Sequence, residues 1–270
     1  MCRLFCSLSS SEISPYKEIF ESRYSILRQA EEEGHKDGWG AYAYSGRHLA
    51  LLARDTMPLP ETAEEAKAIV KGISSTCTGF FIRKASNPLN LPKEEIWTID
   101  ATQPFTYGEI AFMHNGAVNE PRKVMRELSE PGRLPRSNND SEVYFIIFIK
   151  YLKELGDAYK AFAATERFIA KSYEKVKEDS DADKPAYTSL NAIVADGSHV
   201  YAFNKYTSKW IKSVSDPGRE FYRMCYKEED GRMLIASEPT DESEWHDIGN
   251  GMFLDAWIDG GEVKHSMKSV

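Results

Sequence analysis

The sequence has few cysteines, no long apolar run and no block of Lys or Arg residues. Its four cysteines, Cys2, Cys6, Cys77 and Cys225, are too few and too scattered for a disulfide framework, so each is interpreted as a thiol. The apolar run at 143–149 is far shorter than the roughly 20 residues that cross a bilayer. The sequence therefore predicts no membrane span.

The charge balance is acidic, with 34 Lys and Arg against 42 Asp and Glu and a formal net charge of −8. Nucleic acids and anionic membranes require a basic surface, so neither is expected as a partner, and small-molecule substrates are favoured. A hydrophobic share of 41% beside 28% charged residues is typical of a globular chain. The start of the chain does not resemble a secretory signal, so a cytoplasmic location is expected.

Several common motifs are also missing from the sequence. It contains no Gly-x-Gly-x-x-Gly, no phosphate-binding loop, no His-Glu-x-x-His, no Cys-x-x-Cys and no Gly-x-Ser-x-Gly. Cys2 and Cys6 would share one strand face without a third ligand nearby. We therefore expect neither a metal nor an organic cofactor.

The pattern of secondary structure favours an α+β fold with antiparallel sheets. Helices are expected at about 14–33, at 63–72 behind a capping box of Thr62 and Glu65, at 141–155 and at 158–177. Strands are expected at 1–8, 41–44, 48–53, 76–83, 110–114, 189–195, 200–203, 220–226, 233–236 and 252–258. Because no long linker divides these elements, residues 1–270 are interpreted as one domain.

Cys2 is the sharpest chemical feature of the sequence. Removal of Met1 would leave the Cys2 thiol beside a free α-amine with a pKa of about 7.7–8.0. That amine can act as the base, and an adjacent ammonium lowers the pKa of a thiol, so one residue can supply both nucleophile and proton acceptor. Taken alone, a cysteine after Met1 is more simply a small residue in a buried strand.

Further blocks of sequence change that interpretation. They follow one another as Met1-Cys2, Asp37-Gly38-Trp39-Gly40, Ile82-Arg83-Lys84-Ala85-Ser86, Gln103-Pro104-Phe105, His114-Asn115-Gly116 and Asn139-Asp140-Ser141-Glu142. In these blocks the chain resembles the class II glutamine amidotransferases, which open with Met-Cys and release ammonia from glutamine. The stretches 191–197 and 236–245 resemble the stand-alone glutaminase-domain branch, so the resemblance covers nearly the whole chain.

The resemblance implies a fold and a reaction. The fold is a four-layer αββα sandwich of the N-terminal-nucleophile hydrolase type, with two antiparallel sheets between helical layers. The reaction is attack of Cys2 on the γ-amide of glutamine, followed by hydrolysis of a thioester to glutamate and ammonia. No metal or organic cofactor is needed, and a separate acceptor or synthase protein is an expected partner, because few residues remain for a second domain.

The matched residues carry specific expectations. Arg83, at the end of a strand, suits a bidentate grip on the substrate α-carboxylate, although a surface ion pair is the common role of an arginine. Asn115 and Gly116 together suit an oxyanion hole, although Asn-Gly is also a frequent tight turn. His114 is expected to be a packed strand-end residue and not the base.

Three more positions belong to the same expected site. Asp140 is a natural N-cap for a helix starting at Ser141, and the resemblance assigns it to the substrate α-ammonium. Trp39 and Gly40 are expected in a close-approach loop beside the nucleophile, with a core tryptophan as an equal alternative.

The chain departs from the family pattern at two positions, where Phe81 and Gln103 replace the usual histidines. If either histidine orders the pocket in the family, this chain would turn over more slowly or accept a different ammonia donor. Two alternatives therefore stay open. The first is a γ-glutamyl hydrolase that acts on glutathione or a related compound, and the second is a catalytically silent glutamine-binding regulatory subunit.

Overall fold

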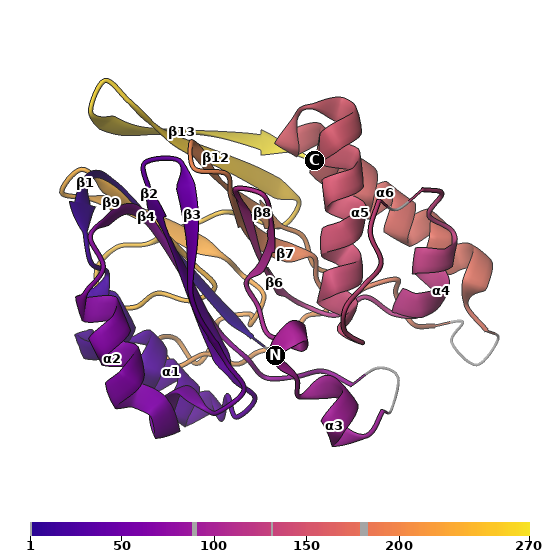
Figure 1. The fold of residues 1–270 in the computed structure, drawn as a ribbon, viewed down its shortest axis with the longest axis horizontal. Helices are drawn as coiled ribbons and strands as arrows, with labels where there is room; N and C mark the ends of the chain where they lie inside the picture. The colour runs from indigo at the N-terminus through magenta and orange to yellow at the C-terminus, as the bar shows by residue number, and fades with distance from the viewer. Residues whose placement is uncertain (1, 88–90, 131, 179–182) are drawn as a thin grey trace.

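The computed structural model describes residues 2–87, 91–130, 132–178 and 183–270. Two antiparallel sheets lie face to face, with α1 and α2 outside one sheet and α5 and α6 outside the other (Figure 1). The larger sheet has seven strands in the order β11-β9-β10-β1-β4-β2-β3, and the smaller has six in the order β13-β12-β8-β7-β6-β5. This arrangement confirms the expected α+β class and the αββα layering.

The two sheets are built from the strands β1 to β13. They are β1 Arg3–Ile13, β2 Trp39–Ser45, β3 His48–Asp55, β4 Ser75–Ile82, β5 Phe105–Tyr107, β6 Ile110–Asn115, β7 Asn191–Ala195, β8 His199–Asn204, β9 Cys225–Glu229, β10 Arg232–Ala236, β11 His246–Asp247, β12 Met252–Asp259 and β13 Glu262–Ser269. The helices are α1 Ile26–Glu33, α2 Ala63–Lys71, α3 Lys93–Ile96, α4 Pro121–Arg126, α5 Asp140–Leu155 and α6 Ala158–Val176. No helix in the described part of the chain is long and apolar enough to cross a membrane.

The alternation of side chains along the strands explains the layers. Successive residues of a strand point to opposite faces, so a strand with two apolar faces can contact both a helix and the other sheet. In β1, Phe5 packs towards α1 and α2, whereas Cys6 packs between the sheets. In β6, Phe112 packs towards α5 and α6, whereas Met113 packs between the sheets. Burial of each such phenylalanine contributes about 1.5–3 kcal/mol.

Helix α5 carries the most apolar face of the chain. All residues of its first ten positions, Asp140 to Ile149, are buried, because the helix lies between the six-stranded sheet and its helical neighbours. Its start is capped by Asn139, whose side chain accepts from the Ser141 N–H, and it ends at Gly156 in the left-handed conformation. The first turn of α5 is therefore fixed by both burial and capping.

The prediction of one continuous helix over 14–33 is wrong, because the segment contains two separate helical pieces. A π-helical turn at Lys17–Glu21 ends at Ser22, where the backbone becomes extended, and α1 begins separately at Ile26. Ser25 caps α1 by accepting from the Arg28 N–H at 3.3 Å. The break has a physical cause, because the N–H of the intervening Tyr24 pairs with the carbonyl of Thr240 from a distant segment.

Two further expectations need correction. The helix after Thr62 is confirmed as Ala63–Lys71, but Thr62 does not cap it, because its hydroxyl accepts from the Trp39 indole at 2.8 Å and donates to a preceding carbonyl. The strand expected at 220–226 begins only at Cys225, and the additional strand β13 follows the Asp259-Gly260 turn.

Candidate active site

The Cys2 thiol lies immediately before β1, which is flanked by β10 and β4 in the seven-stranded sheet. It faces a small cavity whose lining residues are Cys2, Arg83, Lys84, Ala85, Ser86, Gln103, Gly116, Asn139 and Ser141. The cavity measures about 20 Å³, close to the space that one water molecule needs. Roomier pockets lie elsewhere on the molecule.

Asn115 brings the second sheet to this thiol. It is the last residue of β6, and its Oδ1 accepts from the backbone N–H of Cys2 at 3.1 Å. Its Nδ2 is buried and has no hydrogen-bond partner among the described residues. A buried amide donor without a partner costs about 1–3 kcal/mol, and a hydrogen bond to a ligand oxygen would remove that cost.

The next residue, Gly116, has no room for a side chain. A Cβ at this position would lie 2.0 Å from the Ser189 carbonyl oxygen. Gly116 also lines the cavity, so its backbone approaches the space beside Cys2 closely. The structure thus places Gly116 in the cavity lining, whereas Asn115 lies outside that lining and contacts Cys2 through its Oδ1. Their role as an oxyanion site stays a prediction.

Arg83 follows β4 and is held firmly at the cavity. Its backbone N–H donates to the Gly38 carbonyl at 2.8 Å, and the Asp37 carboxylate accepts from the nearby Ala85 N–H at 2.7 Å. One guanidinium nitrogen, NH2, donates to the Ile96 carbonyl at 2.7 Å, while NH1 is buried without a partner. Burial lowers the pKa of the guanidinium, and a second donor on Arg83 is free for an anion.

Asp140 is buried at the start of α5, and the prediction that it caps this helix is wrong. Asn139 is the N-cap, because its Oδ1 accepts from the Ser141 N–H at 2.9 Å, while Oδ2 of Asp140 accepts from the Val118 N–H at 2.8 Å. Burial raises the pKa of Asp140 to about 6, although backbone N–H groups and Arg83 oppose that shift.

His114 is fully buried and fits the expected packed role. Its Nε2 lies 3.0 Å from the Ser189 carbonyl, which can only accept, so Nε2 carries the proton and Nδ1 accepts from the Ser141 hydroxyl at 2.9 Å. Burial lowers the pKa of His114 to about 4, so the ring is neutral near pH 7. With both nitrogens engaged, His114 is not placed to take a proton from Cys2.

Gln103 has a positioning role that the sequence reasoning missed. Its Oε1 accepts from the His114 N–H at 2.5 Å, and its Nε2 donates to the His114 carbonyl at 3.2 Å. This pair of hydrogen bonds fixes the end of β6 directly before Asn115. The only signal in the sequence was the place of Gln103 before Pro104, which the resemblance marked as a departure.

The structure does not bring Trp39 to the cavity. The indole is buried on the helical side of the seven-stranded sheet and stacks on Phe80 with ring centroids 5.5 Å apart. Gly40 does not line the cavity either, but a Cβ there would lie 2.1 Å from the Gln103 carbonyl oxygen. Gly40 therefore allows Gln103 to approach β2. Phe81, the other departure, is fully buried between the sheets.

The protonation state of Cys2 follows from its surroundings. Burial raises the pKa of the thiol, and this effect outweighs the charges nearby that lower the pKa. The sulfur lies 3.8 Å from the Lys84 carbonyl, and the backbone hydrogen bond of Lys84 opposes the rise in the pKa without overcoming it. The thiol of this site therefore needs a proton acceptor to become a nucleophile.

Metal ligation is not supported by the arrangement of side chains. Within the described residues, no group of three or more His, Cys, Asp or Glu side chains is placed to hold a metal ion. All four cysteines are free thiols.

Solved structures share the fold of the chain. A glutamine aminotransferase class-II domain protein from Silicibacter pomeroyi superposes with a TM-score of 0.63 at 17% identity, covering 99% of both chains. Glutamine phosphoribosylpyrophosphate amidotransferase from B. subtilis superposes with a TM-score of 0.59 at 13% identity, covering 98% of this chain and 49% of that one. At such low identity these similarities concern the fold alone.

Two curated proteins resemble the chain in sequence. Gamma-glutamyl-hercynylcysteine sulfoxide hydrolase from Mycobacterium tuberculosis is 26% identical over 245 residues, which are 90% of this chain and 84% of that protein. Probable glutamine amidotransferase DUG3 from Saccharomyces cerevisiae is 26% identical over 183 residues, which are 56% of this chain and 50% of that protein. The chain therefore spans most of the first relative and about half of the second.

The sequence model of the family described as glutamine amidotransferases class-II matches residues 1–269. This match covers both sheets and every residue that lines the cavity at Cys2. Together with the αββα fold, it shows that the chain belongs to the class II glutamine amidotransferases and is an enzyme of that class.

Proposed function

We propose that the protein hydrolyses the γ-amide of glutamine to glutamate and ammonia through a thioester on Cys2. The observation that carries this proposal is the pair of buried donors without partners, Asn115 Nδ2 and Arg83 NH1. Asn115 is hydrogen-bonded to the Cys2 nitrogen, and Arg83 lines the cavity at the thiol. Unpartnered buried donors are rare in folded proteins because they are costly. Here each fits a different oxygen of the same substrate.

The proposed reaction starts with the nitrogen of Cys2. Removal of Met1, which lies outside the described residues, would convert this nitrogen into an α-amine. The amine takes the thiol proton as the sulfur attacks the γ-carbonyl carbon, and it returns a proton to the departing ammonia. Water then hydrolyses the thioester, and glutamate leaves. Asn115 Oδ1, which accepts from the Cys2 nitrogen at 3.1 Å, would orient the amine during both transfers.

The tetrahedral intermediate places a negative charge on the former carbonyl oxygen. Nδ2 of Asn115 and the backbone N–H of Gly116 are proposed to stabilise this oxyanion. Since Nδ2 makes no other hydrogen bond, it needs no rearrangement of partners when the charge develops. Gln103 would keep this donor in place by holding the two backbone groups of His114.

The head group of the substrate is proposed to be recognised by opposite charges. Arg83 would bind the α-carboxylate through its free NH1, and Asp140 would bind the α-ammonium. Both side chains are buried, so these ion pairs would be poorly screened by solvent. The pair selects a free amino acid head group over the interior of a peptide.

A γ-glutamyl hydrolase is the second candidate, because a relative with that name matches 90% of the chain. Such a substrate presents the same head group and the same γ-carbonyl, and only the leaving group differs. For the glutaminase, we further propose a separate acceptor protein that consumes the ammonia. A catalytically silent glutamine-binding subunit would bind the head group without using Cys2.

A panel assay separates these candidates. The purified protein is incubated with glutamine, glutathione and γ-glutamyl dipeptides, and glutamate is measured together with ammonia or the released amine. A glutaminase should have its highest kcat/KM with glutamine. A γ-glutamyl hydrolase should have its highest kcat/KM with a substrate whose leaving group is larger than ammonia. A diazoketone analogue of glutamine labels Cys2 in either enzyme. If the analogue does not label Cys2 and no substrate is turned over, although the protein still binds glutamine, only the silent regulatory subunit remains as a candidate.

Processing of the N-terminus tests the base. Intact-mass measurement should find active protein without Met1, and activity should follow the fraction of that species. An added N-terminal tag converts the amine into a non-basic amide and should abolish turnover while the thiol remains. Full activity of a preparation that uniformly carries Met1 would exclude the α-amine as base.

A further inference from the structure

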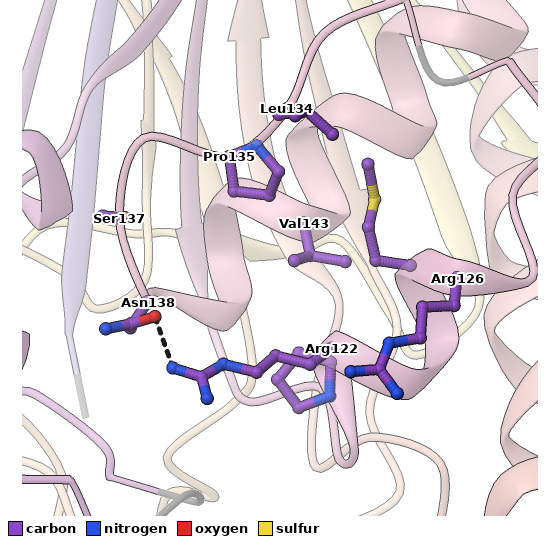
Figure 2. A pocket seen from close by; sticks show the side chains of 9 residues that line it. Arg122, Arg126, Leu134, Pro135, Ser137, Asn138 and Val143 are labelled. Carbon is purple, nitrogen blue, oxygen red and sulfur yellow. Dashed lines mark hydrogen bonds between the residues drawn. The ribbon is translucent and has the colours of Figure 1, made fainter.

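A second pocket lies between α4 and the loop that leads into α5. It measures about 350 Å³, which is within the range of small-molecule sites. Its lining residues are Pro121, Arg122, Met125, Arg126, Leu134, Pro135, Ser137, Asn138 and Val143, and none of them lines the cavity at Cys2. Figure 2 shows Arg122 and Arg126 on one side of this pocket and Leu134 and Pro135 on the opposite side, with Val143 between them.

The two arginines give the pocket a positive side. Arg122 and Arg126 are four residues apart on α4, so their side chains lie on the same face of the helix. Among the described residues, neither guanidinium forms an ion pair with a carboxylate within 4.0 Å. The Arg122 guanidinium donates to Asn138 Oδ1 at 2.6 Å, and the amide of Asn138 in turn donates to Glu95 at 3.1 Å.

The opposite side of the pocket is apolar. Leu134 is 75% exposed, the largest exposure among the large hydrophobic side chains of the described residues. Val143 forms the floor as part of the core around α5, and Met125 packs against the same core. Leu134 lines the same pocket as Met125 and Val143, and contiguous apolar surface of this kind marks ligand-binding grooves.

The wall that carries Leu134 is held in place from within. The buried carboxylate of Glu142 accepts from the side chain of Arg133 at 2.9 Å and from the backbone N–H groups of Arg136 and Ser137 at 3.0 and 2.9 Å. These charge-assisted hydrogen bonds tie the loop to the first turn of α5. The pocket is therefore largely preformed, which reduces the entropy cost of binding a ligand.

We propose that this pocket binds a small organic anion, with its acidic group between Arg122 and Arg126 and its apolar body against Leu134 and Val143. A carboxylate matches the guanidinium geometry, and the apolar wall distinguishes such a ligand from an inorganic ion. The ligand would differ from the proposed substrate, since this pocket contains no carboxylate to bind an α-ammonium. Ser137 and Asn138 in its wall directly precede Asn139 of the Cys2 cavity.

The test uses 1-naphthaleneacetate as the probe, with 1-naphthaleneacetamide as its uncharged match and inorganic phosphate as an anion without an apolar body. Binding to the full chain is followed by isothermal titration calorimetry, which does not depend on turnover. We expect saturable binding of the carboxylate that is at least tenfold tighter than binding of either comparison compound. Equal binding of the amide would overturn the charge argument, and equal binding of phosphate would overturn the apolar argument.

Variants locate the binding site. Arg122→Gln and Arg126→Gln should each weaken binding of the carboxylate about tenfold, because each removes one charged hydrogen-bond donor. Leu134→Ser should weaken binding of the carboxylate without changing binding of phosphate. Because Leu134 is highly exposed, the variant should still fold. Arg47→Gln is the matched control, since Arg47 is exposed in the turn between β2 and β3 and does not line the pocket. No saturable binding to the wild type, or equal binding by the Arg122 and Arg126 variants, refutes the proposal.

Discussion

Substitution of Asn115 by alanine tests the oxyanion donor most directly. The side chain makes one hydrogen bond, from the Cys2 N–H to Oδ1, and leaves Nδ2 buried without a partner. Asn115→Ala removes a hydrogen bond worth about 1 kcal/mol and also removes an unpaired donor that costs about 1–3 kcal/mol. These contributions have opposite signs, so the free energy of unfolding should change by no more than about 2 kcal/mol.

The effect on catalysis should be much larger. Loss of one preorganised oxyanion donor lowers kcat by about 10²- to 10³-fold, which corresponds to about 2.7–4 kcal/mol. Because the charge develops only in the transition state, kcat and kcat/KM should fall together while KM stays nearly constant. Steady-state release of glutamate from glutamine gives both constants, and urea titration gives the folded fraction.

A matched control separates this effect from damage to the fold. Asn204 is also a buried asparagine with one unpartnered atom, since its Nδ2 donates to the Gly249 carbonyl while Oδ1 has no partner. Asn204 ends β8 and bonds to Gly249 instead of Cys2, so Asn204→Ala should retain kcat. A kcat within threefold of wild type for folded Asn115→Ala would refute the oxyanion assignment.

Three other predictions concern the thiol and the head group. Cys2→Ala should abolish turnover. Cys77→Ala, in the core between the sheets, should retain kcat in its folded fraction and lower the free energy of unfolding by about 1–2 kcal/mol. An activity assay measures kcat, and urea titration of the same preparation measures the free energy of unfolding. Arg83→Lys should raise KM for glutamine about tenfold, because lysine cannot keep the bond to Ile96 and bind a carboxylate at once, and an unchanged KM would contradict this role. As Asp140 protonates below pH about 6, kcat/KM for glutamine should fall about tenfold further per pH unit than protonation of the Cys2 α-amine alone produces. A profile without this added fall between pH 6 and 5 would contradict its role.

The same titration has a consequence for stability. Because the pKa of Asp140 in the folded state, about 6, lies above its ordinary value, the folded protein binds this proton more tightly than the unfolded chain does. The resulting contribution to stability is complete below pH about 4 and is lost as the pH rises through about 6. Burial is the dominant cause, and Asp140→Asn should remove this dependence.

The order of the elements was predictable because their signals are local. Helix α5 was recognisable from its apolar run at 143–149, and the hairpin of β2 and β3 from its central glycine turn. The break before α1 was not, because it depends on a hydrogen bond from Tyr24 to Thr240, more than 200 residues away in sequence. Strand β13 was missed because it is an edge strand with only two apolar residues, Val263 and Met267, packed against the core.

The residues of the site were more predictable than their contacts. Ordered motifs identified Cys2, Arg83, Asn115, Gly116 and Asp140. Their partners depend on how distant segments meet. No local pattern could show that Asn139 caps α5 and leaves Asp140 free to accept from Val118. A single domain and a cytoplasmic location stay predictions of the sequence.

The thiol and its expected oxyanion donor belong to different sheets. Cys2 leads into β1 of the seven-stranded sheet, whereas Asn115 ends β6 of the six-stranded sheet. The apolar side chains between the sheets, among them Cys6 and Met113, therefore set the separation of two reacting groups. A change of volume in this layer can alter the reaction rate without touching the substrate. Directed evolution of this enzyme would then yield activity variants in the inter-sheet core as well as around the cavity.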